Sequence, residues 1–186
     1  MPFLDFDTEL QRAIEVASSL YGAPVSKFAF LPVEYHDKDY AQTIVDDGAA
    51  TIAVKLANPI VFANDDYRTK GAIYQLWHEA VHCLAPVNRM DTLWFEEGVA
   101  IRFCQRRAPV ERRYLVESWK HMKKPWSTVR DKFAQLNPTD AQIRATRERA
   151  KGRFFDNITE ELIVEECNAK KNLAADLCRR LPKDSR

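Results

Sequence analysis

The chain has 186 residues, of which 46% are hydrophobic and 30% are charged, a composition typical of soluble globular proteins and a length sufficient for one domain with its own core. Its 28 basic and 27 acidic side chains give a formal net charge of +1, so we expect neither nucleic acid nor an anionic membrane as a partner held by overall charge. No stretch approaches the roughly 20 apolar residues of a membrane span, and the N-terminal MPFLDFDTELQ lacks the basic start and long apolar run of a signal peptide.

The four cysteines form no CxxC pair and are too few for a disulfide framework in a chain of this length. They are Cys83, Cys104, Cys167 and Cys178. We expect all four to act as small buried hydrophobic residues, and a cytoplasmic location follows as the expected one.

The N-terminal third predicts one helix and a small sheet. Apolar residues recur at helical spacing over residues 5–20, and a Gly-Ala-Pro sequence at 22–24 ends the pattern. Residues 27–36 and 40–48 are rich in β-branched and aromatic side chains, and TIAVKLANPIVF follows the Asp47-Gly48 turn signal. We therefore predict a mostly antiparallel sheet over residues 27–63.

From residue 66 the pattern becomes helical. One helix is predicted through residue 85, where Pro86 follows, and a second fits residues 92–107. Further helices are predicted at 109–122, 126–136, 138–151 and 158–181. Basic residues cluster here, and we interpret them as a solvated helix face; they are Arg102, Arg106, Arg107, Arg112, Arg113, Lys120, Lys123 and Lys124.

These elements predict a single α+β domain over residues 1–186. It would consist of a helix plus a small sheet (1–65), two helices that carry the candidate site (66–107), and an all-helical C-terminal part (108–186). The sequence contains no internal repeat and no low-complexity linker that would argue for a second domain.

The most specific motif is WHEAVHCLAP at residues 77–86. Residues four apart on a helix project from the same side, so His78 and His82 can offer two imidazoles to one ion. Glu79 lies beside that face, where it can take a proton from a water on the metal, which is the HExxH arrangement of zinc hydrolases. The competing interpretation is two half-buried histidines that are merely hydrogen-bonded on a helix.

A catalytic zinc needs a third protein ligand, and residues 92–103, TLWFEEGVAIRF, contain candidates. Trp94–Ala100 match the W-L-x-E-G-x-A pattern that follows HExxH in zinc aminopeptidases, with phenylalanine in place of leucine. On these two motifs the sequence resembles the gluzincin metallopeptidases, which include thermolysin and the zinc aminopeptidases. The resemblance implies a Zn²⁺ ion held by His78, His82 and Glu97. Glu96 is the alternative third ligand, and would otherwise face solvent or support a ligand.

The resemblance covers about residues 66–105 and implies a zincin-like fold, with an edge strand beside the metal that pairs with an extended peptide. We take residues 51–56 as the candidate edge strand; an ordinary buried strand is the alternative. Gly98 and Ala100 are expected to let their helix approach the HExxH helix closely. The chain is much shorter than the large zinc aminopeptidases and lacks their GxMEN motif, so aminopeptidase activity is not implied.

The predicted activity is zinc-dependent hydrolysis of peptide bonds in a peptide or protein substrate, with Glu79 as general base. Related enzymes often stabilise the oxyanion with a downstream tyrosine or histidine, for which Tyr114 and His121 are candidates. Several aromatic residues form either a specificity pocket or simply core; they are Trp119, Trp126, Phe133, Phe154 and Phe155.

Two other classes of function stay open. The chain could be a non-proteolytic regulatory or interaction protein that retains the metal site, or a zinc hydrolase of a non-peptide amide or ester. The sequence does not distinguish endopeptidase from exopeptidase action, and it leaves the substrate and the oligomeric state undetermined.

Overall fold

The computed structural model describes residues 5–25, 28–38, 40–57, 65–87, 92–111 and 124–181, of which residues 65–68 are described by their backbone alone. The α-helices in these ranges are α1 (Phe6–Tyr21), α2 (Asp65–His82), α3 (Trp94–Arg107), α5 (Trp126–Leu136), α6 (Asp140–Arg149), α7 (Glu160–Cys167) and α8 (Lys171–Leu177). The strands are β1 (Ala29–Phe30), β2 (Glu34–Tyr35), β3 (Gln42–Asp46) and β4 (Thr51–Leu56).

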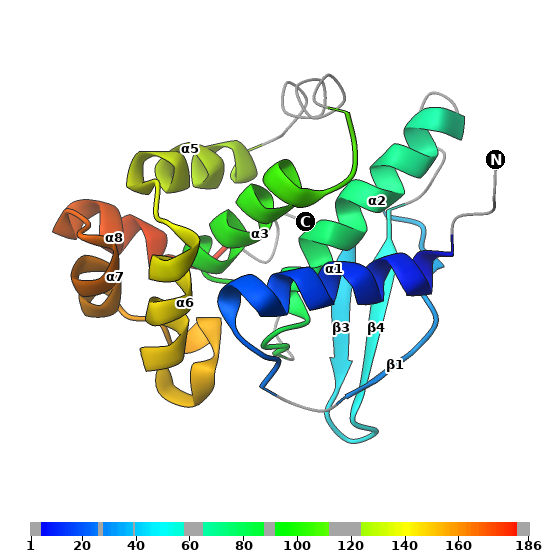
Figure 1. The fold of residues 1–186 in the computed structure, drawn as a ribbon, viewed down its shortest axis with the longest axis horizontal. Coiled ribbons are helices and arrows are strands. Elements are labelled where there is room, and N and C mark those ends of the chain that lie inside the picture. The colour runs from blue at the N-terminus through cyan, green and yellow to red at the C-terminus, as the bar shows by residue number, and fades with distance from the viewer. Residues whose placement is uncertain are drawn as a thin grey trace.

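The architecture is mixed α+β, as predicted. The small open sheet lies at one end of the molecule, α2 and α3 lie in the middle, and α5 to α8 form the other end (Figure 1). No helix within the described ranges is both long enough and apolar enough to cross a membrane.

The predicted N-terminal helix is confirmed as α1. The side chain of Asp5 accepts hydrogen bonds from the backbone N–H groups of Asp7 and Thr8 at 3.1 and 3.4 Å, which satisfies two donors of the first turn. Gly22 ends the helix at a φ of 96°, a conformation that favours glycine. The apolar residues of the predicted stripe that become fully buried are Leu10, Ile14 and Ala17.

The sheet is built around β4. Backbone N–H groups of Ala29, Leu31 and His36 all donate to even-numbered carbonyls of the β4 segment, so β1 and β2 follow one another along the same side of β4. Both pair with β4 in parallel, whereas β3 pairs with it antiparallel across the turn predicted at Asp47-Gly48. Two of the three pairings are thus parallel, and a mostly antiparallel sheet is not confirmed, because the β1–β2 segment runs alongside β4 rather than forming a hairpin with β3.

The prediction that residues 51–56 form the edge strand is wrong. β4 has neighbours on both sides, and its alternate residues Ile52, Val54 and Leu56 are buried under the helices. Among the described residues β3 pairs with β4 alone, so β3 forms the edge on that side. The alternating pattern of residues 51–56 reports burial of one face of a strand, and it holds no information about which strand is outermost.

α2 is fixed by contacts to the elements on either side of it. The indole Nε1 of Trp77 donates to Oε1 of Glu9 on α1 at 2.7 Å, and its ring stacks on Phe103 of α3 with centroids 5.3 Å apart. The backbone N–H of Ala57, just after β4, donates to Oε1 of Gln75 at 2.8 Å. These contacts fix the rotation of α2 about its axis and so determine where its histidines point.

The C-terminal helices partly match the prediction. The predicted helices at 126–136 and 138–151 are confirmed as α5 and α6, and the predicted helix at 109–122 lies largely outside the described residues. The single long helix predicted over 158–181 is wrong, because Asn168 adopts a left-handed conformation with φ 52° that ends α7 before α8 begins.

The end of the described chain returns to the start of α3. The backbone N–H of Leu181 donates to the carbonyl of Thr92 at 3.0 Å, and that of Trp94 donates to the carbonyl of Arg179 at 2.8 Å. The segment that leads into α3 is therefore held by hydrogen bonds to the last described residues.

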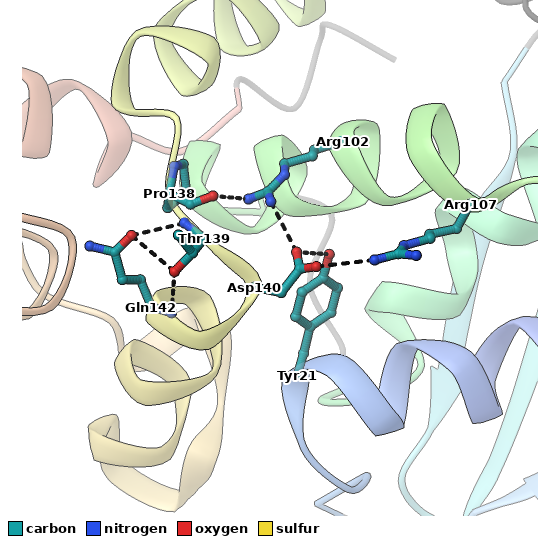
Figure 2. A network of polar contacts seen from close by, with 7 residues as sticks. All are labelled: Tyr21, Arg102, Arg107, Pro138, Thr139, Asp140 and Gln142. Atoms are coloured by element: carbon teal, nitrogen blue, oxygen red, sulfur yellow. Dashed lines mark hydrogen bonds and ion pairs between the residues drawn. The ribbon is translucent and has the colours of Figure 1, made fainter.

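Part of the predicted basic surface is buried instead. Arg102 is only 9% exposed, and its guanidinium donates to the carbonyl of Pro138 and, at 3.0 Å, to Asp140 at the start of α6 (Figure 2). Asp140 also accepts from Arg107 at 3.3 Å and from the Tyr21 hydroxyl at 3.5 Å. This carboxylate therefore joins α1, α3 and α6, so Arg102 has a structural role that its place in a charged sequence did not suggest.

Arg147 on α6 is fully buried and connects the ends of two helices. Its guanidinium donates to the carbonyls of Tyr21, Gly22 and Ala23 after α1 and to the carbonyl of Leu84 after α2, at 2.8–2.9 Å. Burial lowers its pKa to about 10, so the group stays charged at neutral pH. The positive charge lies at the C-terminal ends of both helices, where it adds to the hydrogen bond that the Leu84 carbonyl also accepts from the backbone N–H of Val25.

Gly98 is required for packing, through a contact that the sequence did not suggest. A Cβ built on Gly98 would lie 2.7 Å from Cβ of Phe133 on α5, and closer still to its ring. The small residue therefore admits Phe133 against α3.

We expect Gly98→Ala to destabilise the protein by about 1–3 kcal/mol, because the clash with Phe133 outweighs the better helix propensity of alanine. Urea unfolding followed by circular dichroism measures the loss. In a Phe133→Leu background the cost of Gly98→Ala should shrink; equal costs in both backgrounds would contradict the assigned contact.

Arg147→Met should destabilise the protein by about 3–5 kcal/mol, because the three buried carbonyls after α1 lose their guanidinium donor and the carbonyl of Leu84 keeps only the N–H of Val25. Arg147→Lys should recover only part of this, since an ammonium cannot reach all four acceptors. The matched control is Arg144→Met on the exposed side of α6, which should change the unfolding free energy by less than about 0.5 kcal/mol. Equal effects of Arg147→Met and Arg144→Met would refute the role of Arg147.

Candidate metal centre

α2 presents its two histidines to one point, as the HExxH spacing predicts. The Nε2 atoms of His78 and His82 lie 3.3 Å apart, and their ring centroids are 5.2 Å apart. Ligand atoms of His78, Glu79 and His82 all lie within 4.8 Å of one another, so this group could hold a metal ion. His82 is buried and His78 is half-buried, which leaves access from one side.

α3 brings a carboxylate to the same point. Oε1 of Glu97 lies 3.1 Å from Nε2 of His78, and Oε2 lies 3.6 Å from Nε2 of His82. Glu97 is 2% exposed, and the hydroxyl of Thr92 donates to its Oε2 at 3.4 Å. Two nitrogen donors and one carboxylate thus face one another from two helices.

The electrostatics of this cluster favour a bound cation. Burial by itself would raise the pKa of Glu97, but His78 and His82 hold it well below its usual range. Burial would likewise lower the pKa of both histidines, yet Glu97 raises that of His78 well above its ordinary value, and hydrogen bonds to Glu96 and Glu97 raise that of His82 to about 9. A buried carboxylate at this position requires a positive charge, either protons on the imidazoles or a metal that displaces them.

Glu96 supports one histidine from behind. Its Oε1 lies 2.8 Å from Nδ1 of His82, and the residue is 2% exposed, so it does not face solvent. The Nδ1–H of His82 donates to this carboxylate, so Nε2 is the nitrogen that faces the ion position and can bind a metal that displaces its proton. Glu96 also interacts electrostatically with the buried guanidinium of Arg147. Its carboxylate therefore faces a positive charge on α6 as well as the imidazole of His82.

Glu79 is held from the edge of the sheet. The hydroxyl of Thr43, in the middle of β3, donates to Oε2 of Glu79 at 2.7 Å. Glu79 is 4% exposed, and burial, followed by the charge of Glu79, raises the pKa of the neighbouring Cys83 thiol, which stays protonated. The sequence analysis did not single out Thr43, and a contact that spans 36 positions carries no local signal in the sequence.

A small cavity of about 20 Å³ adjoins Glu79 and His82, which is room for about one water-sized group. Its lining is mostly polar and comes from four segments; the residues are Thr43, Glu79, His82, Pro86, Val87, Thr92 and Glu96.

Other sequence-based candidates fall elsewhere. Tyr114, His121 and Trp119 lie outside the described residues, so the predicted oxyanion donors have no described position. Phe133 and Phe155 are buried in the core, which supports the simpler interpretation of these aromatics. The cysteines are free thiols; Cys83, Cys104 and Cys167 are buried as expected, whereas Cys178 is only half-buried.

Comparison of the chain with protein-family models, with curated proteins and with solved structures finds no match in any of the three. The geometry and chemistry of this site are therefore what indicates a function for the chain.

Replacing Glu96 should weaken metal binding without removing a ligand. We expect Glu96→Ala to lower the affinity for zinc by roughly 10- to 100-fold, because His82 loses the partner that orients its ring. Glu96→Gln retains an acceptor and should lose less. Competition with a chromophoric chelator measures both, with Glu15→Ala on the exposed face of α1 as the control. Unchanged affinity in Glu96→Ala would contradict the assigned contact.

Proposed function

We propose that the protein is a zinc-dependent hydrolase of peptide bonds, a small metallopeptidase of the gluzincin type that works in the cytoplasm. The observation that carries the proposal is the convergence of His78, His82 and Glu97, with Glu79 beside them. The HExxH motif and the glutamate one helix later support the resemblance, as does an edge strand, β3, next to the site.

The donor set fits zinc in type and spacing. Two imidazoles and one carboxylate are the zinc ligands of thermolysin, and they leave one position for solvent or substrate. Donors 2.0–2.1 Å from a tetrahedral ion lie about 3.3 Å apart. The two Nε2 atoms lie 3.3 Å apart, and one oxygen of Glu97 lies 3.1 Å from that of His78 and the other 3.6 Å from that of His82, all close to this value.

Two carboxylates could complete the set, and their partners favour Glu97 as the ligand. Oxygens of Glu97 lie at ligand spacing from both imidazoles, whereas Oε2 of Glu79 accepts the hydrogen bond of Thr43. Glu79 is near the ion position but is held by the sheet, as a general base needs to be.

β3 supports the choice of a peptide substrate. Its pairing with β4 leaves the far edge of β3 without a described neighbour, and Thr43 places this strand next to Glu79. An extended peptide that adds to β3 would bring its backbone past the base, and such pairing tolerates many side chains.

The proposed mechanism divides roles among these residues. When bound, zinc would polarise the scissile carbonyl and lower the pKa of a coordinated water. Glu79 accepts the proton through the oxygen that Thr43 does not hold and delivers it to the leaving amine. His82, oriented by Glu96, keeps its donor nitrogen directed at the ion position. Tyr114 and His121 remain the proposed oxyanion donors.

Glu79→Gln should reduce peptide hydrolysis by roughly 10²- to 10⁴-fold, the usual contribution of a general base, while zinc content stays the same. Mass spectrometry of a mixed peptide library after incubation with the zinc-loaded chain measures cleavage, and elemental analysis measures bound zinc.

Two companion variants sharpen this test. Glu97→Ala should lose zinc and cleavage together, whereas Glu15→Gln, exposed on α1, should change neither. Zinc binding with no cleavage that depends on Glu79 would refute the peptidase and favour a binding protein. Cleavage of small amides or esters, but of no peptide, would favour the non-peptide hydrolase instead.

A further inference from the structure

Thr43 occupies a position that the proposed function does not by itself explain. Its side chain reaches from β3 to the active-site helix through the 2.7 Å hydrogen bond to Oε2 of Glu79. It stands opposite Val54 in the sheet, and Val54 is 1% exposed, so both side chains face the helices.

The backbone of the same residue faces the other way, toward the edge of the sheet. Even-numbered carbonyls of the β4 segment accept from β1 and β2, so the odd-numbered residues of β4 exchange their hydrogen bonds with β3. The partners of Thr51, Ala53 and Lys55 are Asp46, Ile44 and Gln42. By alternation, the N–H and C=O of Thr43 point to the edge that faces away from β4.

Glu79 is close enough to the ion position to become a ligand. One of its oxygens lies within 4.8 Å of the imidazole nitrogens, and His78, Glu79 and His82 together form a group that could hold an ion. Carboxylates bind zinc readily, and a fourth protein ligand would close the position that a catalytic site keeps open. Something must therefore hold Glu79 away from the ion.

We infer that Thr43 is a positioning residue that keeps Glu79 out of the metal's coordination sphere and available as the base. The inference rests on the proposed function. The hydroxyl holds one oxygen of Glu79, and leaves the other for proton transfer. Because the backbone of Thr43 lies at the open edge of β3, a peptide bound there would be registered against the same residue that holds the base.

The inference predicts that removing the hydroxyl converts Glu79 from a base into a ligand. Thr43→Val retains the shape and the β-branch that suit a strand, and it loses only the donor. Thr43→Ser retains the donor. If Thr43 had a purely structural role, the variants would change the stability of the protein but would leave the ligands of the metal unchanged.

The test uses Co²⁺ bound to the full chain, because its visible absorption reports the number and type of ligands. We compare wild type, Thr43→Val, Thr43→Ser, Glu79→Gln and the double variant Thr43→Val/Glu79→Gln, with kcat and KM for peptide cleavage measured on the zinc forms. Ile44→Val, on the opposite face of β3, is the matched control and should leave the spectrum unchanged.

We expect a shifted and weaker cobalt spectrum in Thr43→Val, and a return to the spectrum of Glu79→Gln alone in the double variant. We also expect kcat to fall by roughly tenfold or more with little change in KM, because a lost hydrogen bond to a charged group has about this effect. Thr43→Ser should restore the wild-type spectrum and most of kcat. If Thr43→Val does not fold, Thr43→Ala takes its place under the same criteria.

Identical cobalt spectra in wild type and Thr43→Val would overturn the inference, whatever happens to kcat. A shift that persists after Glu79 is replaced would overturn it as well, because the new ligand would then be another group. Failure of the wild-type chain to cleave peptides would refute the proposed function, and the spectra would still decide the role of Thr43. Failure to bind Co²⁺ at all would refute the metal centre and both proposals.

Discussion

The structure depends on one electrostatic constraint, the burial of the Glu97 carboxylate between two imidazoles. A charge withdrawn from water requires an opposite charge close by. His78 and His82 both lie within ion-pair distance of Glu97 and can provide that positive charge. Because the carboxylate comes from α3 and the imidazoles from α2, the pair of helices has to meet in a fixed register. The remaining contacts of the molecule can be understood by how they maintain that register.

The supporting contacts come from residues that do not belong to the cluster. Trp77 joins α2 to α1 and α3, while Arg147 joins the carbonyls that follow α1 and α2. Arg102 and Asp140 fix α3 against α6, and Gly98 admits Phe133 on the α5 side of α3. Each of these residues contacts a neighbouring element rather than the ion position, so substitutions there should lower stability and should affect the chemistry only by moving the ligands.

Three glutamates lie at or next to the ion position, and each contacts a different partner. Glu97 faces both imidazoles, Glu96 contacts the far nitrogen of His82, and Glu79 accepts a hydrogen bond from β3. Identical side chains can therefore serve as ligand, orienting group and base, because a carboxylate's role depends on what holds each oxygen. This separation of roles is the physical basis of the proposed hydrolase.

The sequence by itself determined the local features: the helices at α1, α2, α3, α5 and α6, the shared face of His78 and His82, and the candidacy of Glu97. These follow from helical periodicity and short-range spacing, which act within a few residues. Only the tertiary structure decided that β3 rather than residues 51–56 is the edge, that Glu96 is buried behind His82, that Arg102 is internal and that Thr43 holds Glu79. Strand order and contacts between distant segments depend on how whole elements pack, and no local pattern encodes that packing.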